Sequence, residues 1–297
     1  MRIIYYYQTL TDLSSILIEN TPVTHIILSS FHFGKNSDNL SYIHLNDFPP
    51  NDSKFNKVWC QLKEANEKYN IEVHIMLGGS GGAFNALFSE FDTYYGMLFN
   101  TLIAHSFIAG INLDIEESTT LSNTQMLIKC LKRDFGSNFK ITMAPVQSSL
   151  QSNIPGMGGF CYKDLYCSPE GKMIDYFNGQ FYYDLSFDAY KQCITNGYPS
   201  EKIVLGMIAS QDISGALQVV KQINNVYPNF GGVFMWEYFN APPNGTKNPE
   251  IWAYLMKKAI ETNSTDNKKN ITDTNTNFIQ ELFLKVTDYI QNFKFHN

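Results

Sequence analysis

The chain has 297 residues, 44% of them hydrophobic and 14% aromatic, which is enough for one large α/β barrel or for two modest domains. Its formal net charge of −6 at pH 7, with no basic cluster, argues against a nucleic-acid partner. The sequence has no stretch of about 18 apolar residues that would predict a transmembrane helix. Met1 leads almost directly into the strand-like residues 3–7 without a signal peptide, so by default we expect a cytoplasmic protein with no membrane partner.

The five cysteines form an odd count and show no metal-ligand spacing, so the sequence predicts no metal site. Cys161 and Cys167 are the only close pair. Free thiols in a reducing compartment are the simplest account of this pattern, and a single bridge between these two residues is the alternative.

Short strand-like runs alternate with helix-like segments along most of the chain. The strands are predicted at 2–7, 24–31, 71–77, 108–116, 139–144, 174–182, 202–208 and 231–237. The helices are predicted near 9–19, 54–69, 87–105, 121–135, 185–197, 213–226 and 249–262. About eight such repeats predict a parallel sheet that closes into a single (β/α)8 TIM barrel. An open doubly wound sheet is the alternative, but it needs a glycine-rich turn after the first strand, and residues 8–11 contain no glycine.

The fourth predicted strand, residues 108–116, has an unusual polar face. Apolar residues alternate there with small or polar ones, so Asn112, Asp114 and Glu116 lie on one face of the strand. A solvated edge strand is the alternative, but it fits poorly because the opposite face is aliphatic and no turn cluster flanks the strand. Two carboxylates this close suit general acid–base chemistry, because each shifts the proton affinity of the other.

Polar or aromatic residues also collect at the carboxyl ends of several predicted strands, where (β/α)8 barrels carry their chemistry. These residues are Ser29, Ser30, the glycine-rich run 78–82, Met143 with residues 144–147, Gln180, Tyr182, Tyr183, Gln211, Asp212, Trp236 and Glu237. Alone, a tryptophan such as Trp236 fits a core position and the glycines fit a turn. Together, these groups predict a binding cleft.

The composition changes after about residue 262. Residues 263–277 are rich in Thr, Asn, Asp, Ser and Lys, which predicts a polar linker. Residues 278–297 regain helical periodicity. We therefore expect a catalytic domain at 1–262, followed by this linker and an amphipathic helix that docks on the barrel or mediates self-association.

These residues resemble glycoside hydrolase family 18, in particular the hevamine-like chitinases of plant class III. The fourth-strand signature of that family is Asp-Gly-x-Asp-x-Asp-x-Glu, and residues 109–116 read AGINLDIE. Four further stretches agree in order and spacing, namely 76–79 (MLGG), 143–145 (MAP), 180–182 (QFY) and 231–236 (GGVFMW). The resemblance covers roughly residues 1–260 and leaves the tail unexplained.

The resemblance implies a retaining hydrolase that uses its substrate's own acetamido group, an exception to the usual two-carboxylate scheme. Glu116 would protonate the glycosidic oxygen, while Asp114 would orient the acetamido group that attacks the anomeric carbon. Tyr182 would hydrogen-bond the acetamido oxygen, and Trp236 would form the apolar floor of the sugar site. The other substrate-binding residues implied are Gln180, Met143, Tyr183, Gly79 and Asn112. No metal or organic cofactor is required.

Two residues depart from the family signature. Ala109 replaces the first aspartate, and we expect mainly a local packing change. Asn112 replaces the middle aspartate, and its amide can donate a hydrogen bond to Asp114 but cannot exchange a proton. The alignment of the sixth strand also has an alternative, in which residues 181–184 rather than 180–183 match the family motif.

The leading function is an endo-acting hydrolase of β-1,4-linked N-acetylglucosamine, with chitin or chito-oligosaccharides as substrates. An endo-β-N-acetylglucosaminidase that cuts N-glycan cores is the first alternative, because the same family contains both activities. A catalytically weak chitin-binding lectin is the second alternative, although Glu116, the acid position that such lectins have usually lost, is intact.

Overall fold

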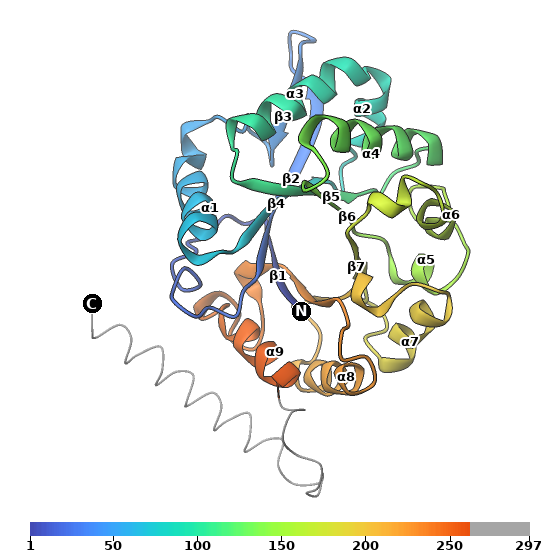
Figure 1. Ribbon diagram of the computed structural model, residues 1–297. Coiled ribbons are helices and arrows are strands. Elements are labelled where there is room, and N and C mark those ends of the chain that lie inside the picture. The colour runs from blue at the N-terminus through green and yellow to red at the C-terminus, as the bar shows by residue number, and fades with distance from the viewer. Residues whose placement is uncertain (262–297) are drawn as a thin grey trace, which may run out of the picture.

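The computed structural model describes residues 1–261, so the predicted linker at 263–277 and helix at 278–297 lie outside the described residues. Within this range a ring of helices surrounds a closed barrel of eight parallel strands (Figure 1). The strand order is β1-β9-β8-β7-β6-β5-β4-β2, and pairing of β1 with β2 closes the barrel. The predicted (β/α)8 TIM barrel is therefore confirmed.

Each element has the following bounds. The barrel strands are β1 (Arg2–Tyr7), β2 (His25–Lys35), β4 (Glu72–Gly78), β5 (Ile108–Asp114), β6 (Lys140–Met143), β7 (Tyr176–Gln180), β8 (Ile203–Ile208) and β9 (Gly232–Trp236). The α-helices are α1 (Asn56–Tyr69), α2 (Phe84–Ser89), α3 (Phe91–Ala104), α4 (Leu121–Phe135), α5 (Gln147–Gln151), α6 (Tyr162–Cys167), α7 (Phe187–Thr195), α8 (Ile213–Val226) and α9 (Ile251–Glu261). Short 3-10 turns are η1 (Ser53–Phe55), η2 (Gly171–Met173), η3 (Ser200–Lys202), η4 (Tyr238–Asn240) and η5 (Gly245–Lys247).

The helix predicted at 9–19 is wrong, because residues 11–20 form turns and irregular structure. Leu13, Ile16 and Leu17 are buried. Their helix-like spacing therefore reflects the burial of one side of an irregular segment and not a helix. The side chain of Asp12 accepts the backbone N–H of Ser14 at 2.8 Å. Such local side-chain bonds offer the backbone an alternative to the helix.

A hairpin that the sequence did not predict extends the barrel at β2. The long strand β2 runs on past the barrel, and β3 (Ser41–Leu45) pairs antiparallel with its last residues, from Phe31 to Lys35. The hairpin stands beside α3 (Figure 1). In the chain, β2 is therefore followed by β3, and helix α1 comes only after this hairpin.

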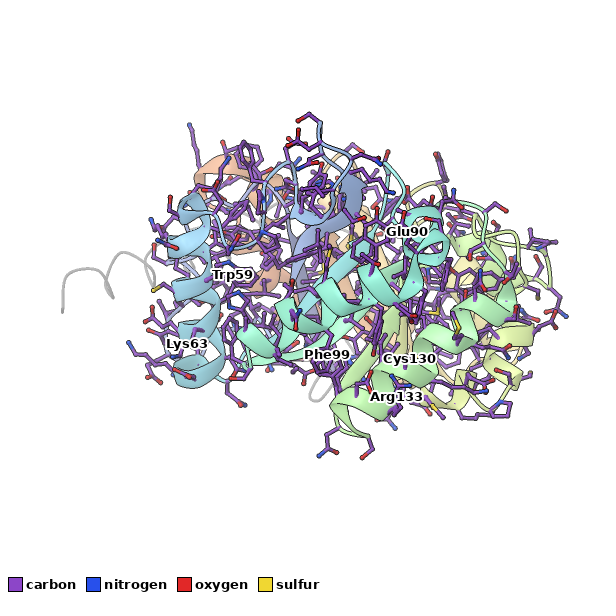
Figure 2. All side chains as sticks on the ribbon, turned by 90° about the horizontal axis from the view of Figure 1, so that it is seen from above. Trp59, Lys63, Glu90, Phe99, Cys130 and Arg133 are labelled. Carbon is purple, nitrogen blue, oxygen red and sulfur yellow. The ribbon has the colours of Figure 1, made fainter. Side chains whose placement is uncertain are left out.

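The core has two parts. The larger part fills the space between the sheet and the surrounding helices, while a smaller one lies inside the barrel around Tyr6, Met76 and Phe234. The helices turn their charged residues outward, as Lys63 of α1 and Arg133 of α4 show (Figure 2). The barrel interior is thus a packed core, and its side chains support the residues at the carboxyl end of the barrel.

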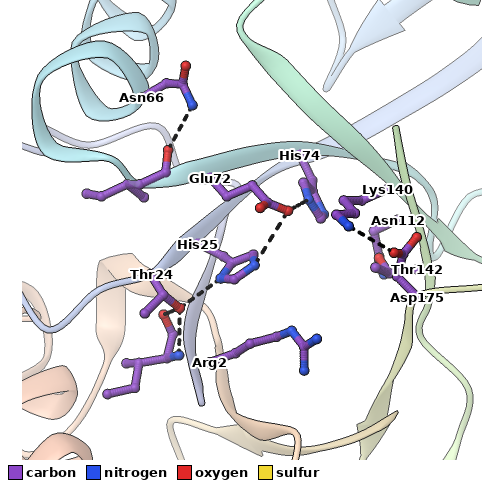
Figure 3. Close-up of polar contacts among 12 residues, drawn as sticks. Arg2, Thr24, His25, Asn66, Glu72, His74, Asn112, Lys140, Thr142 and Asp175 are labelled. Atoms are coloured by element: carbon purple, nitrogen blue, oxygen red, sulfur yellow. Dashed lines mark hydrogen bonds and ion pairs between the residues drawn. The ribbon is translucent and has the colours of Figure 1, made fainter. Parts of the chain in front are cut away.

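A polar cluster closes the amino end of the barrel (Figure 3). His74 has its Nε2 atom 2.7 Å from a carboxylate oxygen of Glu72, and His25 has its Nε2 atom 3.6 Å from the same oxygen. Arg2 lies over the ring of Tyr176 at 4.0 Å from its centroid. Arg2 and Glu72 thus place charged groups at the amino end of the barrel.

The five cysteines are free thiols, so the possible bridge between Cys161 and Cys167 is not formed. Among residues 1–261, no helix is long and apolar enough to cross a bilayer.

Candidate active site

A pocket of about 260 Å³ opens at the carboxyl end of the barrel. Its walls come from the ends of β1, β2, β4, β5, β7 and β9, where the strand-end rule for this fold places chemistry. The residues that line it are Gln8, Ser30, Met76, Gly79, Ser80, Asp114, Glu116, Gln180, Tyr182 and Trp236. Six of the nine site residues predicted from the sequence meet here, namely Glu116, Asp114, Tyr182, Trp236, Gln180 and Gly79.

Asp114 and Glu116 form the acidic centre of this pocket. Strand β5 ends at Asp114, two residues earlier than predicted, so Glu116 belongs to the loop that follows. Asp114 is only 5% exposed, and burial followed by the charge of Glu116 raises its pKa well above the ordinary value. Burial also raises the pKa of Glu116, and the hydrogen bond with the Gln180 amide partly offsets that rise. Both carboxyls therefore hold a proton more tightly than free side chains do.

Gln180, the last residue of β7, fixes the position of Asp114. Its amide nitrogen donates to Asp114 Oδ1 at 3.2 Å and to the carbonyl oxygen of Ala144 at 2.7 Å. The Gln180 side chain thus links the end of β7 to Asp114 and to the chain that follows β6. Gln180 reaches this position because β7 pairs with the end of β6, and an isolated bridge continues that pairing from Val146 to Gln180.

Gly79 lets the backbone pass close to Asp114. Its φ of +86° favours glycine, and a Cβ atom there would lie 2.8 Å from the methyl carbon of Met76. The backbone N–H of Gly79 donates to the Asp114 carbonyl at 2.8 Å. A larger residue would therefore crowd the side of the pocket where Asp114 lies.

Tyr182 and Trp236 supply the aromatic walls. Trp236 ends β9 and packs on Tyr6 at a centroid distance of 5.3 Å, while Tyr182 meets Phe234 edge-on. Burial, followed by the charges of Asp114 and Glu116, raises the pKa of Tyr182 well above its ordinary value. Tyr182 therefore keeps its phenolic proton and is a hydrogen-bond donor at every working pH.

Three predicted residues lie outside the pocket lining. Met143 is 0% exposed and belongs to the hydrophobic core, because β6 ends there with its side chain turned toward the helices. Tyr183 is 100% exposed, because β7 ends at Gln180 and the chain then turns into solvent. Of the two sixth-strand alignments, the one that names Tyr182 thus agrees with the pocket.

Asn112 is fully buried one layer below the pocket. Its amide nitrogen donates to the Thr142 hydroxyl at 2.9 Å, and its oxygen accepts from the Tyr6 hydroxyl at 3.1 Å. Among residues 1–261 these are its side-chain hydrogen bonds, so the expected donation to Asp114 is not made. Asn112 therefore supports the site from below and does not reach a substrate.

Four further residues line the pocket. Ser30 and Ser80 are among the polar strand-end residues expected to form a binding cleft, Met76 belongs to the MLGG stretch, and Gln8 was not predicted. Gln8 directly follows β1 and Ser80 lies just after β4, whereas Ser30 and Met76 lie within β2 and β4, so the strand-end rule applied to the first strand would have found Gln8. Gln8 is held by Glu237, whose carboxylate accepts the backbone N–H groups of Gln8 and Thr9 at 2.8 Å. Among residues 1–261, no group of three or more His, Cys, Asp or Glu side chains is arranged to hold a metal ion.

Solved structures with the same arrangement identify the family. A fungal endo-β-N-acetylglucosaminidase of glycosyl hydrolase family 18 is 30% identical over 89% of this chain and 99% of its own, with a TM-score of 0.78. The chain belongs to glycoside hydrolase family 18. It is a glycosidase with a chitinase-like barrel.

Two solved chitinase structures are also similar to this chain. A chitinase from Aspergillus fumigatus is also 30% identical, over 88% of this chain and 99% of its own, with a TM-score of 0.75. A family 18 chitinase from the fern Peteris ryukyuensis is 16% identical, covers 88% of this chain and 100% of its own, and shares the fold with a TM-score of 0.65. No protein-family model and no curated protein matches the chain.

Proposed function

We propose that this glycosidase is an endo-acting, retaining hydrolase of β-1,4-linked N-acetylglucosamine in chitin or chito-oligosaccharides. The observation that carries the proposal is the meeting of Asp114, Glu116, Tyr182 and Trp236 in one pocket. An aromatic ring for a sugar face, a protonated acid and a buried carboxyl neighbour are the parts that such a reaction needs.

In the first step, Glu116 protonates the glycosidic oxygen as the bond to the leaving sugar breaks. The acetamido oxygen of the substrate attacks the anomeric carbon and forms an oxazolinium ring. The raised pKa of Glu116 supports this role, because the carboxyl holds its proton to a higher pH than a free glutamate side chain does. In the second step, the Glu116 carboxylate takes a proton from the water that attacks the anomeric carbon. The bond from that carbon to the acetamido oxygen breaks, which restores the acetamido group, and Glu116 is again the acid.

Asp114 and Tyr182 control the acetamido group in this proposal. Tyr182 donates its phenolic proton to the acetamido oxygen, and Asp114 accepts the N–H of the same group. The positive charge that develops on the ring favours the ionised form of Asp114, which stabilises that charge. The hydrogen bond from Gln180 holds the carboxyl in place meanwhile.

Within the family, we propose a site of the hevamine-like type. Residues 180–182 read QFY, and both polar members of this motif line the pocket. Gln180 contacts Asp114, which supports a direct part for it in holding the carboxyl.

An endo-β-N-acetylglucosaminidase acting on N-glycan cores is the second candidate. A fungal enzyme of that activity supports this candidate, because its sequence identity to this chain, 30%, is the same as that of the Aspergillus fumigatus chitinase. Both candidates use the same catalytic groups and differ in what surrounds the reacting sugar.

The two candidates are separated by one assay. The purified chain is incubated with a fluorogenic chitotrioside and, separately, with a high-mannose glycopeptide, and the products are quantified. Cleavage of the chitotrioside supports the chitinase, and release of the glycan supports the endoglycosidase. Cleavage of neither substrate would contradict the proposed function.

A further inference from the structure

A second cavity, of about 440 Å³, opens at the amino end of the barrel. Two of its lining residues, Asp175 and Lys202, directly precede strands β7 and β8. The catalytic pocket lies at the other end of the same strands, where Gln180 ends β7. The size of the second cavity falls within the range of about 300–1,000 Å³ that is typical of small-molecule sites.

The second cavity carries an excess of positive charge. Three lysines, Lys132, Lys172 and Lys202, line it with a single carboxylate, that of Asp175. The lysines are far apart in the chain, so the sequence shows no basic cluster and only the fold brings them together. The formal net charge of the whole chain is −6, so this cavity has the opposite sign to the molecule as a whole.

Asp175 does not balance this charge, because its oxygens are already occupied. Its Oδ2 atom accepts the backbone N–H of Ile141 at 2.9 Å and lies 3.5 Å from Lys132 Nζ. Its Oδ1 atom lies 3.2 Å from Nζ of Lys140, which comes from the start of β6 (Figure 3). Lys132 and Lys140 thus share the one carboxylate of the cavity between them.

Lys172 and Lys202 are left without a carboxylate. Neither forms an ion pair within residues 1–261, where Asp175 pairs with the other two lysines. The Lys202 ammonium donates to the carbonyl oxygen of Ile174 at 2.6 Å, and the Lys172 ammonium lies 4.5 Å from the ring centroid of Tyr166. An ammonium group has three donors, so both lysines keep donors that can reach a ligand.

The surroundings of Lys202 show that its charge is not fully compensated. Burial lowers the pKa of Lys202, and the positive charge of Lys172 adds to this effect, although Asp175 opposes it. Taking a charged group out of water is unfavourable unless a partner replaces the lost hydration. An anion in the cavity would supply such a partner to both lysines.

We propose that the second cavity binds a small anion with two or more phosphate groups, and that Lys172 and Lys202 are its main contacts. Phosphate groups carry strong acceptor oxygens and close to two negative charges, and lysine is a common phosphate binder in proteins. The Ser137 hydroxyl, also in the lining, adds a neutral donor. A long polyanion fits less well, because the net negative charge of the chain repels the part that lies outside the cavity. The inference is independent of the proposed function, since the two cavities share no lining residue.

The test is calorimetric titration of pyrophosphate into the full chain, with the ionic strength held constant by sodium chloride so that non-specific attraction is screened equally. We expect saturable binding at one site. Lys172→Gln, at an exposed position, should raise Kd by about 10- to 100-fold, the loss typical of a hydrogen bond to a charged group. Lys202→Gln should act in the same way, and Lys172→Gln decides the question if Lys202→Gln fails to fold.

Lys163→Gln is the matched control. Lys163 also lies over the Tyr166 ring, at 5.3 Å from its centroid, but it is outside the lining of the second cavity. The control removes the same charge from the same region and should leave Kd unchanged. Saturating pyrophosphate should also leave KM for a chito-oligosaccharide unchanged, because the two ligands bind at opposite ends of the barrel.

Three results would overturn the inference while the proposed function stands. They are the absence of saturable pyrophosphate binding, an equal rise in Kd in Lys163→Gln and Lys172→Gln, and competition between pyrophosphate and the chito-oligosaccharide. Failure of the wild-type enzyme to hydrolyse its substrates would contradict the proposed function and leave the result of the titration standing.

Discussion

Glu116 and Asp114 show how burial prepares a site for proton transfer. Their pKa values are raised by desolvation, and in Asp114 the neighbouring charge adds to the effect. Glu116 keeps one side open to the pocket, while Asp114 is almost completely enclosed. This difference suits one residue to deliver a proton and the other to hold the substrate.

Replacing Glu116 with glutamine tests the acid directly. The amide keeps the shape and the hydrogen bonding but has no proton to give, so kcat should fall by about 10²- to 10⁴-fold while oligosaccharide binding persists. Turnover of a chito-oligosaccharide and its affinity by calorimetry give the two readouts. Glu117→Gln, one residue further on, keeps an acceptor for the Phe84 backbone N–H and should retain turnover. More than about a tenth of wild-type turnover in Glu116→Gln would rule out this acid.

Asn112→Asp tests the departure from the family signature. An ionised carboxylate below the pocket would disfavour ionisation of Asp114 and Glu116, and so raise their pKa values further. Because the rate falls when Glu116 loses its proton, the alkaline limb of kcat should move to higher pH. The measurement is kcat against pH for both proteins on one soluble chito-oligosaccharide. Superimposable profiles would mean that position 112 is not coupled to the catalytic centre.

At the scale of elements, helix α9 ties the end of the described chain to its first strand. The Tyr5 hydroxyl donates to the Pro249 carbonyl at 2.7 Å and accepts the Ala253 backbone N–H at 3.2 Å. The Tyr5 ring also packs on Trp252 at a centroid distance of 5.1 Å. These contacts close the ring of helices over the seam where β1 meets β9.

Tyr5→Phe should therefore lower the free energy of unfolding by about 1–3 kcal/mol, since it leaves the buried Pro249 carbonyl without the donor that Tyr5 supplies, while the Ala253 N–H keeps the Glu250 carbonyl as its acceptor. Urea denaturation of both proteins measures the change. Tyr183→Phe removes the same hydroxyl from a fully exposed side chain and should leave stability unchanged. Equal stability of Tyr5→Phe and wild type would show that α9 is not held through this hydroxyl.

The sequence predicted the barrel well because buried parallel strands leave strong apolar runs, and every predicted strand has a counterpart. The sequence did not predict β3 (Ser41–Leu45), because this strand is short and is defined by its pairing with β2. In contrast, the polar face of one predicted strand was enough to identify Asp114 and Glu116 from the sequence. The sequence did not identify Gln8, which enters the pocket because Glu237, far away in the chain, holds its backbone.

At the scale of the whole molecule, the polar cluster at the amino end of the barrel links stability to pH (Figure 3). Burial and then the neighbouring His74 lower the pKa of His25 from 6.5 to about 3. Burial alone would raise the pKa of Glu72, but the hydrogen bond and charge of His74 outweigh it and lower that pKa to about 2. Both groups thus bind protons less readily in the folded chain than in the unfolded one.

The free energy of unfolding should therefore fall as pH drops below 6.5, where the unfolded chain takes up the proton that folded His25 refuses. The loss should continue down to about pH 3, with a slope of up to about 1.4 kcal/mol per pH unit from this group. Urea denaturation at several pH values measures it. His25→Gln should flatten the profile between pH 4.5 and 6.5, above the range in which Glu72 titrates. An unchanged slope in that variant would assign the acid sensitivity to other groups.

The fold places Glu116 beside Asp114, the carboxyl that we propose holds the acetamido group, and the pocket lining contains no third carboxylate that could activate water. Neighbouring-group attack followed by water attack inverts the anomeric carbon twice, so retention of configuration is the central claim of this account. Proton NMR during the first minutes of chito-oligosaccharide hydrolysis reads the anomer directly. We predict that the β-anomer appears first and then mutarotates, whereas a product released mainly as the α-anomer would contradict retention.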